Sequence, residues 1–337
     1  MGARPTIFDV AREADVSKST VSLVLRDSPS VRPETRARVR QAISEIGYIY
    51  NRSAASLRSA RTGLIGLVIN DLRNPFFAEF ASAFQMALAE HGYATVIANT
   101  DERPDLQART LASLLEYGIS GIAISPAYGS EGAASAALET TSTPTLQVLR
   151  RLEAGGESLP FLAPDYAAGS ALGTRHLLDV GCRRIAFLGG LDAKPVTRER
   201  LSGYLAELGT TGLEPLVRTG QASRAFGRDA MDWLRESHPD VDGVLCFNDL
   251  VALGVLASCA RSGPEVGARI KVVGTDDIEA AGDSFPSLTT VSCHTRRLAH
   301  SAADTFVGWI DEGRPPAPIT RLPMSLVRRE STGLRPT

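Results

Sequence analysis

Short apolar runs alternate with longer amphipathic segments along most of the chain, from about residue 63 onward. Buried parallel strands that alternate with helices build doubly wound α/β sheets. Because about 270 residues exceed what one such sheet usually organises, we expect two lobes. The runs are LIGLVI (64–69), ATVIAN (94–99), GIAIS (121–125), RIAFLG (184–189), GVLCF (243–247) and KVVG (271–274).

The beginning of the chain carries its apolar positions at helical spacing instead. Thr6, with Asp9 three residues later, can cap a first helix. Ser17 can cap a second helix that is rich in hydroxyl side chains, and Pro33 stands at the first position of a third. This order predicts an all-α helix-turn-helix head, the kind that reads the major groove of DNA.

The charge distribution favours DNA over the alternative of a small helical bundle without a ligand. Residues 1–62 hold 11 Lys and Arg against 6 Asp and Glu, a net charge of +5. The other 275 residues hold 25 against 32, a net charge of −7. The overall net charge of −2 therefore conceals a basic head on an acidic body, as expected for phosphate contact.

The chain resembles the lactose-repressor (LacI–GalR) family of bacterial transcription regulators in three head motifs, DVAREADVSKSTVSLVL, SVRPETRARVRQAISEIGY and NRSAASLRSARTGLIGLV. The resemblance continues in order through NPFFAEF, GTRHLLDVGCRRIAFLGG, RLSGY, CFNDLVALGVL, VVGTDDIE, SLTTV and LVRRES, almost to the end of the chain. Each motif alone is modest, but the ordered set is very specific.

The resemblance implies three parts, the last of them similar to periplasmic sugar-binding proteins. They are a helix-turn-helix DNA-binding domain at 1–50, a hinge helix and linker at 51–62, and an effector-binding core at 63–337. We expect lobe 1 at about 63–163 and 293–320 and lobe 2 at about 164–292 and 321–332, with crossovers near 162–165, 291–294 and 320–324.

The resemblance also implies roles in the second helix. Lys18 and Ser19 match positions that read bases in the major groove, and Leu23 matches a third. The family usually has Arg in place of Leu23, so apolar contact, for instance with a thymine methyl, replaces a bidentate bond to guanine. Arg26 stands where Asn is usual, and together these departures predict an unusual operator. The other head residues expected at DNA are Thr6 and, at phosphates, Ser17, Thr20 and Ser22.

Asn51 to Ser59 resembles the family's hinge helix, with Asn51, Ala54 and Leu57 expected at the DNA. A flexible linker is the alternative, because a helix of about nine residues is marginal alone in water. The resemblance implies that the helix orders beside its twin in the minor groove, where Leu57 wedges into a base step. Effector-driven separation of the two hinges would then lower DNA affinity.

Ligands of open α/β sheets bind beyond the carboxyl ends of the strands, so residues that follow the apolar runs are candidates. Carboxylate, amide and guanidinium groups that converge there suit the neighbouring hydroxyls of a sugar. As alternatives, Asn248 could only cap a helix, and each arginine could be an ion-paired surface residue. The expected effector-binding residues, most of them by match to the family, are Asp71, Phe76, Phe77, Arg150, Arg200, Phe226, Asn248, Asp276 and Cys293.

Departures from the family bear on the ligand. Ala222 stands where relatives place a stacking aromatic residue, with Phe226 nearby as a substitute, and Leu149 replaces a common Asp. A purine needs flat stacking surfaces. The sequence therefore favours a sugar or sugar derivative, and a purine-type co-repressor is the alternative.

Motifs of enzymes and metal sites are missing from the sequence. The four cysteines lie far apart, the five histidines form no HExxH, and neither GxSxG nor a Walker loop occurs. We therefore expect no enzyme, no cofactor and no metal. Because the start MGARPTIFDV lacks a signal peptide's apolar segment and no run approaches a membrane span, we expect a cytoplasmic protein with reduced thiols and no membrane partner.

Taken with the resemblance, these patterns predict a sequence-specific transcriptional regulator, a repressor, whose operator affinity a small-molecule effector controls. One head offers too few contacts, so we expect a homodimer on a pseudo-palindromic operator of double-stranded DNA. A sugar-binding module without specific DNA binding is the second alternative, and the sequence leaves activation open.

Overall fold

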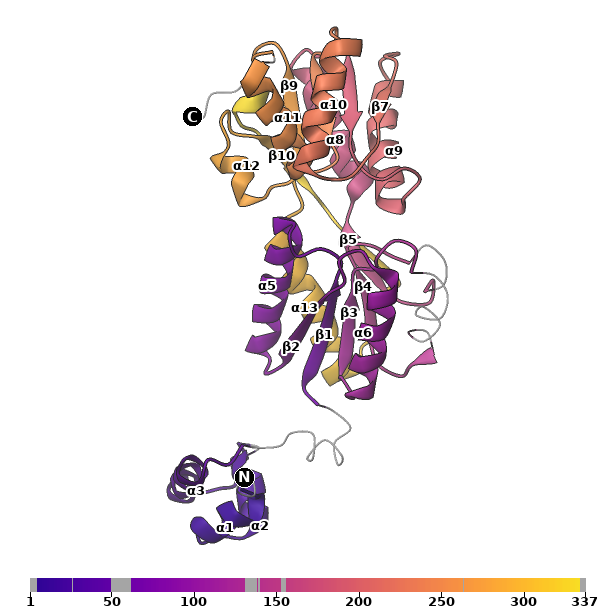
Figure 1. Ribbon diagram of the computed structural model, residues 1–337. Helices are drawn as coiled ribbons and strands as arrows, with labels where there is room; N and C mark the ends of the chain where they lie inside the picture. Colours follow the sequence, from indigo (N-terminus) through magenta and orange to yellow (C-terminus); the bar gives the residue numbers. More distant parts are fainter. Residues whose placement is uncertain are drawn as a thin grey trace. The chain divides into compact units, whose positions relative to one another are not determined.

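The protein is described from a computed structural model that covers residues 5–25, 27–49, 62–130, 138, 140–152, 156–262 and 264–333. The chain divides into two compact units, residues 1–62 and residues 63–337 (Figure 1). We refer to them as the head and the core unit.

The described part of the head consists of three helices, α1 (Ile7–Glu13), α2 (Lys18–Leu25) and α3 (Pro33–Ile46). Their apolar faces meet in a small core in which Val10, Val21 and Val39 are fully buried. Gly47 ends α3 with φ 65°, a left-handed conformation that glycine adopts without strain.

The core unit contains two six-stranded sheets, ordered β11-β5-β4-β3-β1-β2 and β12-β10-β9-β8-β6-β7. Every neighbouring pair is parallel except β10 with β12. The strands of the first sheet are β1 (Leu64–Ile69), β2 (Ala94–Asn99), β3 (Gly121–Ile124), β4 (Thr145–Val148), β5 (Phe161–Pro164) and β11 (Ile319–Leu322). Those of the second are β6 (Ile185–Leu188), β7 (Leu216–Arg218), β8 (Gly243–Cys246), β9 (Lys271–Asp276), β10 (Thr289–Ser292) and β12 (Ser325–Val327).

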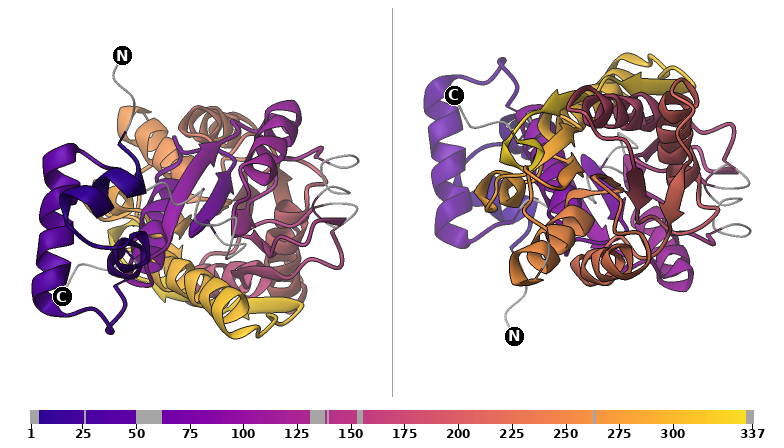
Figure 2. Two further views of the ribbon diagram at one scale, coloured as in Figure 1. Left: turned by 90° about the horizontal axis from the view of Figure 1, so that it is seen from below. Right: turned by 90° about the horizontal axis from the view of Figure 1, so that it is seen from above.

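Helices lie on both faces of each sheet (Figure 2). The first lobe carries α5 (Pro75–Glu90), α6 (Pro104–Glu116) and α13 (Thr295–Glu312). The second carries α8 (Tyr166–Asp179), α9 (Pro195–Gly209), α10 (Arg224–Ser237), α11 (Asp249–Ser262), α12 (Glu279–Asp283) and the 3-10 helix η1 (Glu330–Thr332). Among the described helices, none is long and apolar enough to cross a membrane.

Strand β1 explains why the apolar runs are continuous rather than alternating. Ile65, Leu67 and Ile69 pack in the cluster that includes α5 and α13, whereas Val68 packs in the cluster that includes α6. Because successive side chains point to opposite faces of a sheet and both faces are covered, every position of the strand is apolar.

The chain passes between the two sheets three times: between β5 and α8, between β10 and α13, and between β11 and β12. The last passage follows Leu322, so the first lobe extends about two residues beyond the expected 320. The carboxyl ends of β5 and β10 therefore lead from one lobe directly into a helix of the other.

Candidate DNA-binding helix and effector site

The exposed face of α2 is the candidate surface for DNA. Ser17, Lys18 and Ser19 are exposed at its amino end, whereas Val21 and Val24 on the opposite face are buried in the head core. A helix amino terminus presents backbone N–H groups and the positive end of the helix dipole. Hydroxyl and ammonium groups beside it suit phosphates and base edges.

Hydrogen bonds fix the hydroxyl groups of this surface. The Ser17 Oγ lies 2.6 Å from the Ser19 Oγ and 2.9 Å from the Thr20 Oγ1, and it accepts a bond from the Thr20 N–H at 3.1 Å, which caps α2. Thr6 donates to Asp9 through its N–H at 2.9 Å and its hydroxyl at 2.7 Å, and these bonds lower the pKa of Asp9. Thr6 therefore stabilises the start of α1.

Some of the other residues expected at the DNA are half-buried, and the rest lie outside the part of the chain that the structure describes. Thr20 and Ser22 are half-buried, and Leu23 packs against the head core, so only part of the Leu23 side chain is accessible. Arg26, Asn51, Ala54 and Leu57 lie outside the described residues.

The second lobe brings Arg200 of α9 and Asp276 at the end of β9 together. Arg200 Nη2 lies 3.5 Å from Asp276 Oδ1, with 5% and 4% of the two side chains exposed. Burial raises the pKa of Asp276 to about 6, although the Arg200 guanidinium opposes this shift. Burial lowers the pKa of Arg200, but Asp276, Tyr166 and Cys293 together more than offset that effect, so the pKa is raised and Arg200 stays charged.

Arg200 is held between two aromatic rings. Its guanidinium carbon lies 4.8 Å from the centre of the Tyr166 ring and 4.4 Å from that of Phe247. Within the described part of the chain, Arg200 Nε and Nη1 are buried without a hydrogen-bond partner, and so is the Thr197 Oγ1 one turn earlier on α9. Buried donors are rarely left unpaired, so these atoms indicate a place for a polar ligand.

Cys293 contacts this charge pair, and Asn248 follows Phe247, whose ring stacks on Arg200. The Cys293 thiol lies 3.9 Å from Asp276 Oδ1, and burial raises its pKa well above the ordinary value. Asn248 directly follows Phe247 after β8, and its Oδ1 accepts the Val251 N–H at 3.0 Å, which caps α11. This cap uses only the carboxamide oxygen and leaves the amide nitrogen as a donor for a ligand.

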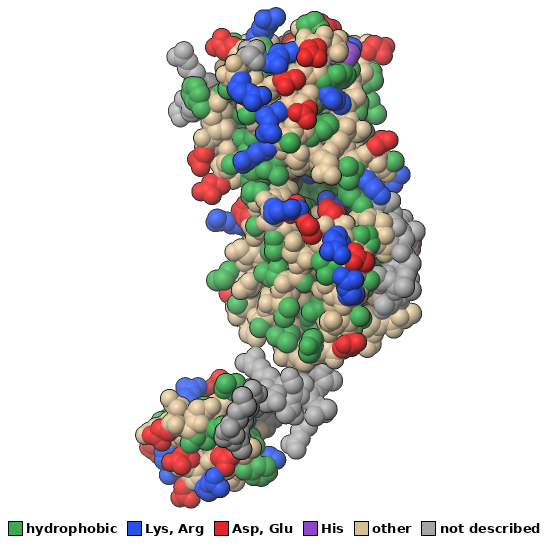
Figure 3. Space-filling view, in the orientation of Figure 1, with side chains coloured by type: hydrophobic (Ala, Val, Ile, Leu, Met, Phe, Trp, Pro, Cys, Tyr) green, Lys and Arg blue, Asp and Glu red, His purple; other side chains and the backbone are tan. Residues whose placement is uncertain are grey.

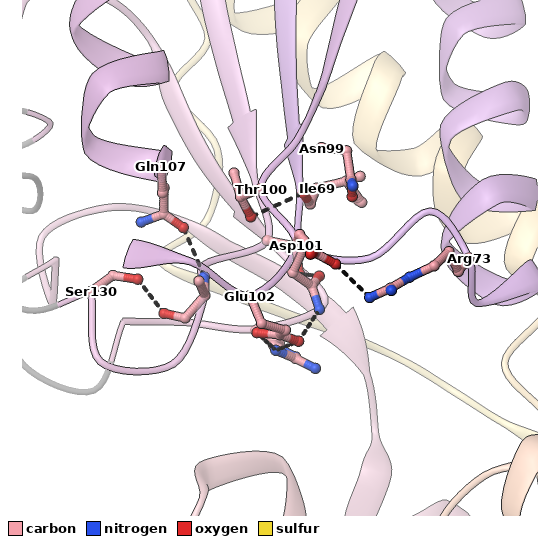
Figure 4. A network of polar contacts seen from close by, with 12 residues as sticks. Ile69, Arg73, Asn99, Thr100, Asp101, Glu102, Gln107 and Ser130 are labelled. Carbon is pink, nitrogen blue, oxygen red and sulfur yellow. Dashed lines mark hydrogen bonds and ion pairs between the residues drawn. The ribbon is translucent and has the colours of Figure 1, made fainter. Parts of the chain in front are cut away.

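The first lobe contributes a second polar network, centred on Glu102 after β2 (Figure 4). Arg150 Nη1 lies 2.8 Å and 3.0 Å from the two Glu102 oxygens, and Asn70 Nδ2 donates to Glu102 at 2.7 Å. Arg73 bridges Asp71, at 2.9 Å, and Asp101. Asp71 is thus ion-paired with Arg73, and Arg150 is ion-paired with Glu102.

Aromatic residues of the first lobe contact Arg150, and a lysine of the second lobe lies against one of them. Phe76 and Phe77 are buried at the start of α5, and the Phe77 ring lies 5.7 Å from the Arg150 guanidinium. Tyr128 after β3 stacks on Arg150 at 4.2 Å, and Lys194 of the second lobe lies 5.1 Å from the same ring. Tyr128 therefore contacts basic side chains of both lobes.

Phe226 of α10 packs at the end of β7. A methyl group at Gly220 would lie 2.1 Å from its ring, and Arg218 lies 6.0 Å from the ring centre. Among the described aromatic residues, Tyr166 and Phe247 are the ones that stack on Arg200. The expected stacking of Phe226 on the effector stays a prediction.

The residues that sequence reasoning missed carry a recognisable signal. Glu102, Tyr166 and Phe247 each follow the carboxyl end of a strand within three residues, as Asp71, Arg150 and Asn248 do. Tyr166 and Phe247 are aromatic and belong to apolar segments, which favours a core role when only the sequence is known. In the described ranges, no group of three or more His, Cys, Asp or Glu side chains is placed so that it could hold a metal ion.

Known proteins resemble this chain along nearly its whole length. Residues 6–51 match the family described as bacterial regulatory proteins, lacI family, and residues 174–332 match a periplasmic binding protein-like domain. A ribose operon repressor from Halalkalibacterium halodurans is 30% identical, over 97% of this chain and 97% of its own. The crystal structure of a lac repressor dimer bound to operator and the anti-inducer ONPF has a TM-score of 0.85 at 29% identity, covering 98% of this chain and 99% of that one. A complex of the transcriptional regulator CelR with cellobiose has a TM-score of 0.72 at 30% identity, covering 97% and 100%.

Proposed function

The chain belongs to the lacI family of bacterial regulatory proteins, and we propose that it is a sequence-specific transcriptional repressor whose operator affinity is controlled by a sugar or sugar derivative. The family and the mixed α/β fold predicted from the ordered motifs are thereby confirmed. The effector binds at the carboxyl ends of the strands, where the Arg200 and Arg150 groups lie.

The buried Arg200–Asp276 pair carries this proposal. Arg200 retains two unpartnered donor atoms within the described structure, and Asp276 offers carboxylate oxygens beside them. Neighbouring hydroxyls of a sugar can accept from the guanidinium and donate to the carboxylate at the same time. Asp71, Phe76, Phe77, Arg150, Asn248 and Cys293 are the further proposed contacts or supports of the effector.

On the DNA side, the amino end of α2 supplies the proposed contacts. Lys18 and Ser19 are exposed where a recognition helix meets base edges, and Ser17 and Thr20 hold hydroxyls ready for phosphates. We extend the proposal to Ser22, Leu23 and Arg26 and, by family membership, to a hinge containing Asn51, Ala54 and Leu57.

Fluorescence anisotropy tests both halves of the proposed function. The full chain is titrated into labelled promoter DNA from its own locus and into random DNA, across a salt series and with sugars and nucleobases added in turn. A repressor of this kind binds one promoter site far more tightly than random DNA, with a steep salt slope. One class of sugar changes that affinity. Equal binding to both DNAs under all conditions would contradict the proposal.

Two subunits are proposed to form a homodimer on a pseudo-palindromic operator. The relative solved with operator is a dimer. Here the edge strand β2 and helix α5 expose apolar side chains, with Met86 61%, Val96 41% and Ile97 36% exposed. The space-filling view has hydrophobic side chains at the surface of this part of the first lobe (Figure 3). An exposed hydrophobic edge strand is a site for association.

The named relatives are regulators of transcription, so we propose that the protein acts by binding and not by catalysis. Its proposed partner is chromosomal DNA, which places its action in the cytoplasm.

A further inference from the structure

Tyr166 is the first residue of α8, directly beyond the first passage between the lobes, and 4% of it is exposed. Its ring stacks 4.8 Å from the Arg200 guanidinium of the second lobe, and its hydroxyl donates to the Leu149 carbonyl of the first lobe at 3.0 Å. One buried side chain thus touches the effector arginine of one lobe and the effector loop of the other. We propose that Tyr166 is a positioning residue that presents Arg200 to the effector only while the lobes keep this arrangement.

The proposal rests on the effector site assigned above and adds the link between its halves. Leu149 precedes Arg150, whose guanidinium is bound to Glu102 in the first-lobe network. Leu149 has φ 65°, and the Arg150 N–H bonds back to the Val148 carbonyl at 2.6 Å. A three-residue turn around a non-glycine residue of positive φ is strained and persists only where its surroundings hold it.

Two hydrogen bonds hold Leu149 in that turn. Its N–H donates to the Leu162 carbonyl of β5 at 2.9 Å, and its carbonyl accepts the Tyr166 hydroxyl. The first of these bonds lies within one lobe, whereas the second joins the two lobes. Loss of the Tyr166 hydroxyl therefore loosens the turn that carries Arg150 without removing any first-lobe residue.

On the other lobe, Tyr166 determines which atoms of Arg200 a ligand can reach. Rings that cover a guanidinium leave its N–H groups directed outward in the plane between them. Here Tyr166 and Phe247 both stack on Arg200, while Nε and Nη1 are unpartnered among the described residues. A side chain that is already ordered loses less entropy when the effector binds.

A second contact between the lobes fixes the backbone on either side of the Tyr166–Arg200 contact. Arg321 of β11 pairs with Glu199 of α9 at 2.8 Å, and it donates to the Pro164 carbonyl at 3.0 Å. Glu199 immediately precedes Arg200, and Pro164 lies two residues before Tyr166. Arg321 thereby links β5 and β11 of the first lobe to α9 of the second lobe. A movement of one lobe relative to the other therefore changes the contacts of Tyr166 with Arg200 and Leu149.

The test compares three variants of the full chain. Tyr166→Phe keeps the ring and removes the hydroxyl, and Tyr166→Leu removes both contacts. Tyr204→Phe is the control, since Tyr204 is also buried and its hydroxyl bonds only inside the second lobe, where it donates to the Ile185 carbonyl at 2.8 Å and accepts the Leu216 N–H at 3.1 Å. Tyr204→Phe reports what the loss of any buried tyrosine hydroxyl does to the protein.

Hydrogen exchange of the unliganded protein gives the first readout. We expect residues 148–152 to exchange at least about threefold faster in Tyr166→Phe, because a net hydrogen bond of typical strength is lost there. Tyr166→Leu should also speed exchange around Arg200. Tyr204→Phe should leave residues 148–152 as they are. Equal exchange of this segment in Tyr166→Phe and wild type would overturn the proposal.

Calorimetric titration with D-ribose and with cellobiose gives the second readout. The sugar that binds the wild type should bind Tyr166→Phe about threefold to tenfold more weakly and Tyr166→Leu more weakly still, with Tyr204→Phe within about twofold of wild type. Unchanged affinity in Tyr166→Phe would refute the positioning role. If neither sugar binds the wild type, the failure counts against these sugars as effectors, and the exchange measurement still decides the role of Tyr166.

Discussion

At the scale of single residues, the Arg200–Asp276 pair shows how burial and charge compete. A carboxylate beside an arginine normally has a lowered pKa, yet at Asp276 burial dominates and raises the pKa to about 6. Asp276 therefore changes its charge in a range of pH where the fold is expected to persist, unlike a solvent-exposed Asp.

Effector affinity should accordingly depend on pH. Above about pH 6 the Asp276 carboxylate is ionised and accepts strong hydrogen bonds from sugar hydroxyls, whereas below it the group is neutral. We expect affinity to fall by roughly tenfold as the pH is lowered from about 8 to about 5. Calorimetry across this range measures the change, and Asp276→Asn should bind with little pH dependence; a parallel decline in that variant would contradict the assignment.

The same shift has the opposite sign for the stability of the unliganded protein. A raised pKa in the folded state contributes stability that is present below the ordinary value of 3.8 and is lost as the pH rises through about 6. Binding and stability therefore favour different charge states of Asp276.

Two substitutions of Asn248 distinguish its role as a helix cap from a role in effector binding. Asn248→Ala removes the cap at Val251 and should lower the free energy of unfolding by about 1 kcal/mol. Asn248→Ser retains a capping oxygen, so its stability in urea titration should stay close to wild type. If Asn248 also binds the effector, Asn248→Ser still loses affinity; wild-type affinity in this variant would leave Asn248 as a cap alone.

At the scale of elements, the closeness of α8 and α9 positions the effector arginine. A methyl group at Gly203 of α9 would lie 2.0 Å from the Ala167 carbonyl oxygen of α8. Glycine is thus required where the two helix backbones meet, one turn from Arg200 on one helix and next to Tyr166 on the other.

Gly203→Ala should force the helices apart. We expect it to lower the free energy of unfolding by about 1–3 kcal/mol, as overpacking does, and to weaken effector binding because Arg200 moves from the Tyr166 ring. Gly209→Ala, in the same helix with no atom within 4 Å of the added methyl group, is the control. It should be neutral or slightly stabilising in urea titration, and similar losses in both variants would speak against the contact.

At the scale of the whole molecule, substitutions in the edge strands β2 and β7 should affect the oligomeric state differently. Val96 of β2 and Val217 of β7 are similarly exposed, at 41% and 39%. If the apolar patch around β2 joins two subunits, Val96→Asp should yield a monomer in light scattering at micromolar concentration. Val217→Asp should remain a dimer. A dimer in both variants would place the interface elsewhere.

The sequence by itself determines the type and order of the elements, because these depend on local periodicity. The six apolar runs all correspond to strands of the two sheets, from β1 to β9. In β1, β3, β6 and β8 nearly every position is buried, because both faces of these strands are covered, whereas the edge strand β2 is largely exposed. Helix-capping signals at Thr6, Ser17 and Pro33 likewise act over three or four residues. The strand-end rule also predicts Asn248 and Asp276 as site residues, whereas the resemblance to the family predicts Arg200, which lies within α9.

Only the tertiary structure decided which of these side chains meet. Arg200 and Asp276 are 76 residues apart in the chain, and their distance depends on how α8 packs against both α9 and β9. The role of Tyr166 depends on two contacts with residues distant in sequence, Arg200 and Leu149, neither of which leaves a periodic signal. Periodicity records which face of an element is buried, but a binding site is formed by contacts between elements, and those depend on the packing of the whole core.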